Sequence, residues 1–144
     1  MSHMPPLLKY RPAPVRVILA VAVPVLLGVL AGVMLGVSEP VYVGFALLGV
    51  AGAYFAGLEH DGARGGLVRG IIGGSLFGLW ILVAHGFFFD SAPKAHIPDP
   101  AIIHVVITTA FGAAFGALGG RRRAKHERKQ HTTTNTPARE TVVA

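Results

Sequence analysis

Two histidines in long apolar segments are the residues of this chain best suited to chemistry. His85 lies near the end of the run 67–89, and His104 lies near the start of the run 101–120, on one helical face with Thr108. Each histidine is about one turn from the same end of its segment, and one loop joins the segments, so we expect the two rings to approach one another. Ionisable groups inside a membrane are costly and often functional. His85, His104 and Thr108 therefore form a candidate intramembrane polar site.

Three interpretations of this site are open. Each neutral imidazole can hydrogen-bond a backbone carbonyl or Thr108 across a helix contact. Alternatively, a histidine that titrates near neutral pH can serve a proton-linked or ion pathway. A third interpretation is a haem or metal site that uses His85 and His104. The spacing contains neither H-x-x-x-H nor H-E-x-x-H, so we predict no metal site and no cofactor.

Two loops carry the other polar candidates. The loop between the third and fourth apolar runs contributes Asp90, His96 and Asp99. The loop between the second and third runs contributes Glu59, His60, Asp61 and Arg64. The second of these loops is either a solvated turn with a local pair between a carboxylate and Arg64, or a gate or docking point for a cytoplasmic partner. The chain has no cysteine, glycine-rich phosphate loop or serine-nucleophile motif, and we expect no enzyme.

The elements that must position these residues are four apolar runs. Of the 144 residues 52% are hydrophobic and 14% charged, whereas soluble domains carry about 25% charged residues. The runs cover 17–37, 41–57, 67–89 and 101–120, and about 20 helical residues cross the roughly 30 Å hydrocarbon layer. The first run is longer than a signal-peptide core and does not end at an A-x-A site, so we expect it to be a retained helix. Residues 17–120 are therefore predicted to form an all-α integral membrane domain of four transmembrane helices, with a kink at Pro24.

Small residues recur every four positions in these runs and predict how the helices pack. The glycines concerned are Gly28, Gly32, Gly36, Gly66, Gly70, Gly74, Gly78, Gly112 and Gly116. Small-xxx-small spacing allows close right-handed crossings of membrane helices. The pattern predicts a four-helix bundle with glycine-striped (GxxxG, or glycine-zipper) interfaces. One stripe can alternatively serve a homo-oligomer or a partner membrane subunit.

The distribution of positive charge predicts the orientation. Of the thirteen lysines and arginines, all but Lys94 lie before the first run, between the second run and the first turn of the third, or after the fourth run. The positive-inside rule then places both termini, residues 1–16 and a basic, disordered tail at 121–144, in the cytoplasm. Arg69, one turn inside the third run, is expected to snorkel back to the headgroups. The net charge of +6 is explained in this way, so the bilayer and not nucleic acid is the expected partner.

These patterns predict a small polytopic protein of a bacterial inner membrane. The bacterial origin rests on the lack of cysteine and the bias toward Ala, Gly, Val and Arg. The predicted function is a non-enzymatic accessory or scaffold subunit, because no charge lies at mid-membrane, where transporters keep their substrate sites. The alternatives are a small oligomeric transporter or channel with a proton-linked site at His85 and His104, and a haem- or metal-binding subunit.

Overall fold

All regular secondary structure in the part of the chain that the structure describes is helical. The structure is a computed structural model that describes residues 5–134, and the side chains of residues 5–130. Its elements are the 3₁₀ turn η1 (Leu8–Tyr10), α1 (Ala13–Val17), the π-helical turn η2 (Ile18–Ala22), α2 (Val23–Val37), α3 (Glu39–Leu58), α4 (Ala63–Phe88) and α5 (Ile102–Thr134).

Four helical segments are long and apolar enough to cross a membrane. They are Ala13–Val37, which joins α1, η2 and α2, then Glu39–Leu58, Ala63–Phe88 and Ile102–Gln130. Many large apolar side chains on the outside of these helices are exposed, as expected where lipid is the solvent. The prediction of an all-helical, multi-pass membrane protein is therefore confirmed. Pro14 and Pro40 lie in first turns, where a missing N–H is tolerated, so these helices start earlier than predicted.

The last helix runs well beyond the predicted boundary at residue 120. The basic stretch, expected to be a disordered tail from 121 to 144, continues α5 as helix to Thr134. Its Arg, Lys, Ala, Glu and Gln residues are strong helix formers, and Arg123 pairs with Glu127 one turn later at 2.7 Å. The remainder of that predicted tail, residues 135–144, lies outside the described residues.

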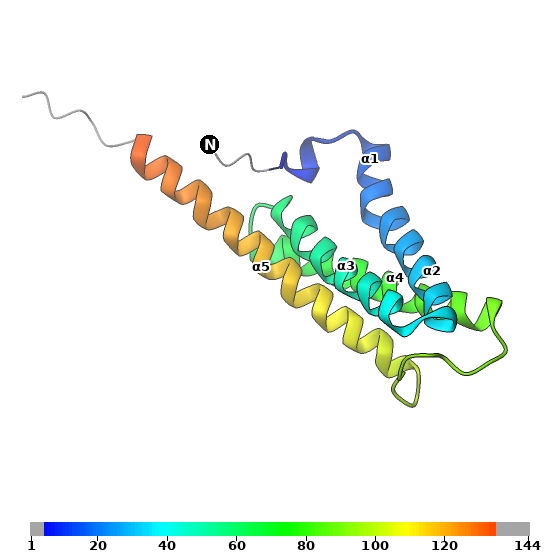
Figure 1. Ribbon diagram of the computed structural model, residues 1–144. Helices are drawn as coiled ribbons and strands as arrows, with labels where there is room; N and C mark the ends of the chain where they lie inside the picture. Colours follow the sequence, from blue (N-terminus) through cyan, green and yellow to red (C-terminus); the bar gives the residue numbers. More distant parts are fainter. Residues whose placement is uncertain (1–4, 135–144) are drawn as a thin grey trace, which may run out of the picture.

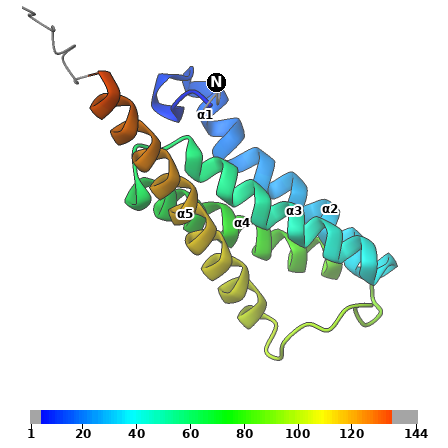
Figure 2. The ribbon, with the colours of Figure 1, turned by 60° about the vertical axis from the view of Figure 1, so that its left-hand side comes forward.

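Helix α4 is the centre of the bundle. It packs most extensively against α5, then against α2, and it also contacts α3, which itself touches α2 and α5. Figures 1 and 2 show α3 between α2 and α5. Two ends can be distinguished. The basic end comprises residues 5–16, the α3–α4 turn at 59–62 and residues 121–130; the loop end comprises Ser38 and the α4–α5 loop at 89–101.

Glycines allow the helices around α4 to approach at backbone distance. A Cβ added at Gly70 would overlap the carbonyl of Gly112 in α5, and a Cβ at Gly112 would overlap the carbonyl of Gly70. Gly66 and Gly116 face one another in the same way one turn nearer the basic end. On the other side of α4, a Cβ at Gly28 of α2 would stand 2.6 Å from the carbonyl oxygen of Phe77. No larger side chain fits at these positions without moving a helix.

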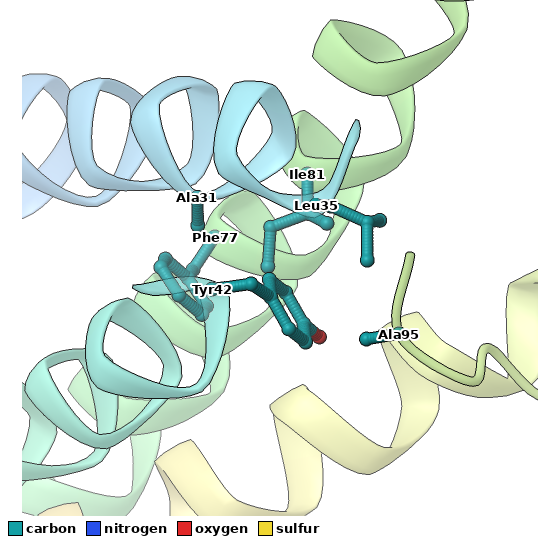
Figure 3. Packing of buried hydrophobic residues seen from close by; sticks show 6 residues of the cluster. All are labelled: Ala31, Leu35, Tyr42, Phe77, Ile81 and Ala95. Carbon is teal, nitrogen blue, oxygen red and sulfur yellow. The ribbon is translucent and has the colours of Figure 1, made fainter. Parts of the chain in front are cut away.

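The core lies toward the loop end, between α2, α3 and α4. Figure 3 shows Ala31, Leu35, Tyr42, Phe77, Ile81 and Ala95 packed together. Ala95 belongs to the α4–α5 loop, which folds back over the end of α2, where the Lys94 N–H donates to the Leu35 carbonyl at 2.9 Å. The loop therefore covers the core and approaches Tyr42.

Candidate functional site

The two histidines lie at different depths in the bundle. Helix α5 meets α4 where Val105 lies against Gly78. His85 is seven residues beyond Gly78, about 10 Å along α4, whereas α5 begins only three residues, about 4.5 Å, before Val105. His85 thus lies past the start of α5, and within the described residues no hydrogen bond or ring contact joins it to His104. The expected approach of the two rings is not found.

His104 pairs instead with a tyrosine from α3. Its Nε2 lies 3.3 Å from the Tyr42 hydroxyl, and both side chains are buried. Thr108, one turn along α5, donates its hydroxyl to its own helix at the Val105 carbonyl, 3.0 Å away. Sequence reasoning missed Tyr42, although a tyrosine early in an apolar run signals a hydroxyl that needs a partner. The polar site is therefore a Tyr42–His104 pair between two helices.

His85 lies against an aromatic ring. It stacks on Phe89 with ring centroids 5.6 Å apart, and the Phe89 ring in turn occupies the space beside Gly36 of α2. The buried Nδ1 of His85 has no hydrogen-bond partner within the described residues. The His85 ring is thus separated from the Tyr42–His104 pair and belongs to the contact between α4 and α2.

The sequence predicts that Arg69 snorkels toward the basic end, but the structure shows the opposite direction. Its guanidinium extends along α4 toward the middle of the bundle, with Nη1 only 2.9 Å from the point where a Cβ at Gly73 would stand. From there Nη2 donates a hydrogen bond to the carbonyl of Leu19 in η2. A glycine at position 73 leaves the room that this orientation needs.

The Leu19 carbonyl accepts this bond because Pro24 disturbs the first helix. The N–H of Val23 donates to the Ile18 carbonyl, in π-helical register, and so does not serve Leu19. The next possible helical donor is residue 24, and a proline has no N–H. Leu19 therefore lacks both its i+4 and its i+5 donor, and the Arg69 guanidinium takes their place.

A cavity of about 550 Å³ runs beneath α3 from the Tyr42–His104 pair to Arg69. We call it the α3 cavity; α2, α3, α4 and α5 all line it, and α3 supplies the largest share. Tyr42, His104 and Thr108 are its polar groups toward the loop end, and Glu59 and Arg69 are those toward the basic end. Between them the wall is apolar. Such a size and such a lining are typical of pockets for small molecules.

The α3 cavity reaches the outer surface of the bundle. Leu47, Gly52 and Phe55 of α3 line it and are exposed, and a Cβ added at Gly52 would meet nothing within 4 Å. Pro5 lines it at the basic end. A molecule lying in the surrounding lipid could therefore enter from the side.

The α3–α4 turn binds the N-terminal segment. Lys9 Nζ lies 2.7 Å from Asp61, Arg11 lies 2.6 Å from Glu59, and the Leu8 N–H donates to the Glu59 carbonyl at 2.9 Å. The hydrogen bond to Asp61 raises the pKa of the Lys9 ammonium above its ordinary value. These carboxylates do not pair with Arg64, which is exposed, so the local pair expected in this turn is replaced by contacts with residues about fifty positions away.

Two further residues secure the basic end. His60 donates from Nδ1 to the Ala56 carbonyl at 3.0 Å. Arg123 of α5 donates to the Pro5 carbonyl at 2.5 Å and to the Leu58 carbonyl at 2.9 Å, and so joins the N-terminal segment, α3 and α5. Lys9, Arg11 and Arg123 thus hold segments of this end together.

The three candidates of the α4–α5 loop, Asp90, His96 and Asp99, are all exposed. Among the residues that the structure describes, no group of three or more His, Asp or Glu side chains could hold a metal ion. The structure thus brings together Tyr42 with His104, and the α3–α4 turn with the N-terminal segment, but not the loop residues.

Comparison with family models, curated proteins and solved structures finds no match to this chain.

Proposed function

We propose that this protein is a small, non-enzymatic accessory protein of the bacterial cytoplasmic membrane, and that it holds the hydrocarbon chain of a membrane lipid in the α3 cavity. The observation that carries the proposal is the α3 cavity itself, about 550 Å³ in volume, apolar along its length and open at the exposed rim of α3. An apolar cavity at a lipid-facing surface favours a lipid chain over water.

The membrane setting of the proposal rests on glycine contacts and charge. The close approach of Gly70 to Gly112 supports GxxxG-type packing, which lets helices associate where surrounding lipid removes the hydrophobic drive for contact. Lysines and arginines gather at the basic end, which supports a cytoplasmic location for that end and for both termini. The accessory role is favoured because the ionisable groups of the basic end clamp neighbouring segments.

A pair of α3 variants tests lipid binding. Gly52 and Gly44 are both exposed, and a Cβ at either would meet nothing within 4 Å, but only Gly52 lines the α3 cavity. Gly52→Leu adds a side chain at the cavity rim, and Gly44→Leu makes the same change elsewhere on the helix. We expect lipid to co-purify with wild type and with Gly44→Leu, and its amount per protein to fall in Gly52→Leu, as measured by mass spectrometry of extracted lipid.

Lipid-free wild-type protein, or an equal loss of lipid in both variants, would contradict the proposal. In the first case the α3 cavity does not retain a chain through purification. In the second case the bound lipid covers the general surface of α3.

A second candidate function, a proton-linked transporter, is favoured by the Tyr42–His104 pair on the cavity wall. Proton flux into liposomes, followed with an entrapped pH-sensitive dye, discriminates the two. The accessory proposal expects no flux above that of protein-free liposomes. A flux that His104→Phe abolishes would favour the transporter.

A further inference from the structure

We infer that the α3 cavity takes an anionic phospholipid, whose phosphate is bound by the guanidinium of Arg69 while a hydrocarbon chain lies beneath α3. The inference rests on the proposed function and adds the chemistry of the headgroup. The observation that supports it is the position of the Arg69 guanidinium at the basic end of a largely apolar cavity.

Arg69 has hydrogen-bonding capacity to spare. A guanidinium has five N–H donors, and the hydrogen bond found for Arg69 within the described residues is that to the Leu19 carbonyl. Glu59, the carboxylate on the same stretch of cavity wall, is paired with Arg11 at 2.6 Å. With two cations against one carboxylate, this end of the cavity keeps a net positive charge. Glu59 attracts Arg69 as well as Arg11, but one carboxylate balances only one of the two cations, and the remaining positive charge favours an anionic ligand.

The orientation of Arg69 supports the same conclusion. An arginine one turn inside a membrane helix lowers its solvation cost by extending to the headgroups. Arg69 extends the opposite way, over Gly73 and into the cavity, where the Leu19 carbonyl freed by Pro24 steadies it. The side chain is therefore presented to a ligand inside the bundle.

The shape of the cavity selects an amphiphile. From Arg69 to the Tyr42–His104 pair the wall is apolar, so a small soluble anion would leave most of the cavity without a matching surface. A phospholipid satisfies both parts, because guanidinium binds phosphate with two parallel hydrogen bonds and the chain covers the apolar wall. The exposed rim at Leu47, Gly52 and Phe55 gives the chain a lateral route from the leaflet at the basic end.

The test compares two lipids that share the phosphate and the chains but differ in the net charge of the headgroup. Full-length protein in detergent is titrated with phosphatidylglycerol or with phosphatidylcholine of the same chains, and bound lipid is counted by native mass spectrometry. Both lipids present an anionic phosphate to Arg69, but the quaternary ammonium of phosphatidylcholine cancels the net charge of its headgroup and repels the guanidinium. We therefore expect wild type to prefer phosphatidylglycerol by about tenfold or more, which corresponds to about 1.4 kcal/mol. Inorganic phosphate at millimolar concentration should not displace the lipid, since it lacks the chain.

Two arginine variants separate the site from general attraction to positive charge. Arg69→Gln removes the charge inside the cavity and should abolish the preference while phosphatidylcholine binding persists. Arg64→Gln removes the same charge from an exposed position on the same helix, outside the cavity lining, and should keep the preference. Arg69→Lys, which retains the charge, should keep part of it.

Equal binding of the two lipids by wild type would overturn the inference while leaving the lipid-holding function in place. So would a preference that survives Arg69→Gln. Wild-type protein that retains neither lipid would overturn the proposed function as well. The wild-type comparison needs no substitution, so it decides the question even if Arg69→Gln does not fold.

Discussion

At the scale of single residues, Pro24 and Arg69 act as a pair although 45 positions separate them in the chain. The proline removes one helical donor and accompanies a π-helical turn that withdraws another, and the Leu19 carbonyl would otherwise remain unsatisfied. An unsatisfied carbonyl and an unpartnered guanidinium are each costly in an apolar surrounding. The hydrogen bond between them satisfies the carbonyl, offsets part of the cost of the guanidinium and fixes the direction of the arginine.

The Tyr42–His104 hydrogen bond makes a measurable contribution to stability. Tyr42→Phe removes the hydroxyl and should lower the free energy of unfolding by about 0.6 kcal/mol, and by no more than about 1.7 kcal/mol, the range measured for such bonds between membrane helices. Equilibrium unfolding in mixed micelles measures the change. Tyr54→Phe is the control, because the Tyr54 hydroxyl makes no hydrogen bond within the described residues. Equal losses in the two variants would show that the Tyr42–His104 bond contributes nothing of its own.

The Lys9–Asp61 ion pair should give stability a dependence on high pH. The pKa of Lys9 is raised above its ordinary value of 10.5 by the hydrogen bond to Asp61, so the folded state binds the proton more tightly than the unfolded state does. The stabilisation is therefore complete below the ordinary lysine pKa and is lost as pH rises through the raised pKa. We expect the Tm difference between wild type and Lys9→Met to be constant from about pH 8 to 10 and to shrink above that range.

Lys125→Met is the matched control for this prediction, since Lys125 is an exposed lysine of the basic end without an ion pair in the described part of the chain. A Tm difference for Lys9→Met that persists unchanged to the highest pH would show that Lys9 acts through packing of its aliphatic stem and not through its charge.

At the scale of helices, α4 uses two faces with different chemistry. Its glycines Gly66, Gly70, Gly74 and Gly78 lie against the backbone of α5, while Phe77 and Ile81 lie against α2. At α5 the glycines of α4 themselves make the close contact, whereas at α2 the glycines belong to the partner helix, where Gly28 lies against the Phe77 carbonyl. Neither contact leaves space for added volume.

Gly74→Leu should destabilise the protein strongly. A Cβ at Gly74 would stand 2.5 Å from the Thr108 carbonyl oxygen and 2.9 Å from the Thr109 Cα, so the α4–α5 contact must open. Overpacking of this kind costs about 1–3 kcal/mol or more. Gly86→Leu on the same helix should cost little, since its Cβ would meet nothing within 4 Å. Thermal unfolding of both variants in one detergent measures the difference, and equal Tm values would contradict the backbone contact seen at Gly74.

Hydropathy predicted the four long helices because length and composition alone define a membrane-crossing segment. The depth of His85 relative to His104 could not be predicted in this way. It depends on where α5 begins after the α4–α5 loop and on which turn of α5 meets Gly78, and neither follows from the two apolar runs taken separately.

The contacts of Arg69, Glu59 and Asp61 could not be predicted from the sequence either. The direction of Arg69 depends on the space at Gly73 and on a carbonyl freed by Pro24 in another helix. The partners of Glu59 and Asp61 come from the N-terminal segment, about fifty residues away, although Arg64 lies closer in the chain. Tertiary structure determines such pairings. Spacing in the sequence instead predicts a pair with the nearest opposite charge, which here is wrong.

At the scale of the whole molecule, charge and apolar surface are separated along the bundle axis. Figure 1 shows the basic extension of α5 continuing past the other helices at the end where the N-terminal segment lies. Each Lys or Arg near an anionic membrane surface contributes about 1 kcal/mol of attraction. In the proposed orientation the basic end lies at the cytoplasmic surface, and the opening of the α3 cavity near Arg69 would face the lipids of that leaflet.

The measurement that tests this account most directly is the orientation of the bundle in living bacteria. Because the chain has no cysteine, single-cysteine variants His96→Cys in the α4–α5 loop and Arg122→Cys in α5 can each be labelled at one position with a membrane-impermeant maleimide. The account predicts that intact cells whose outer membrane has been opened label His96→Cys, and that Arg122→Cys is labelled only after lysis. Labelling of Arg122→Cys in intact cells, with His96→Cys protected, would contradict the proposed orientation and the leaflet assigned to the Arg69 site.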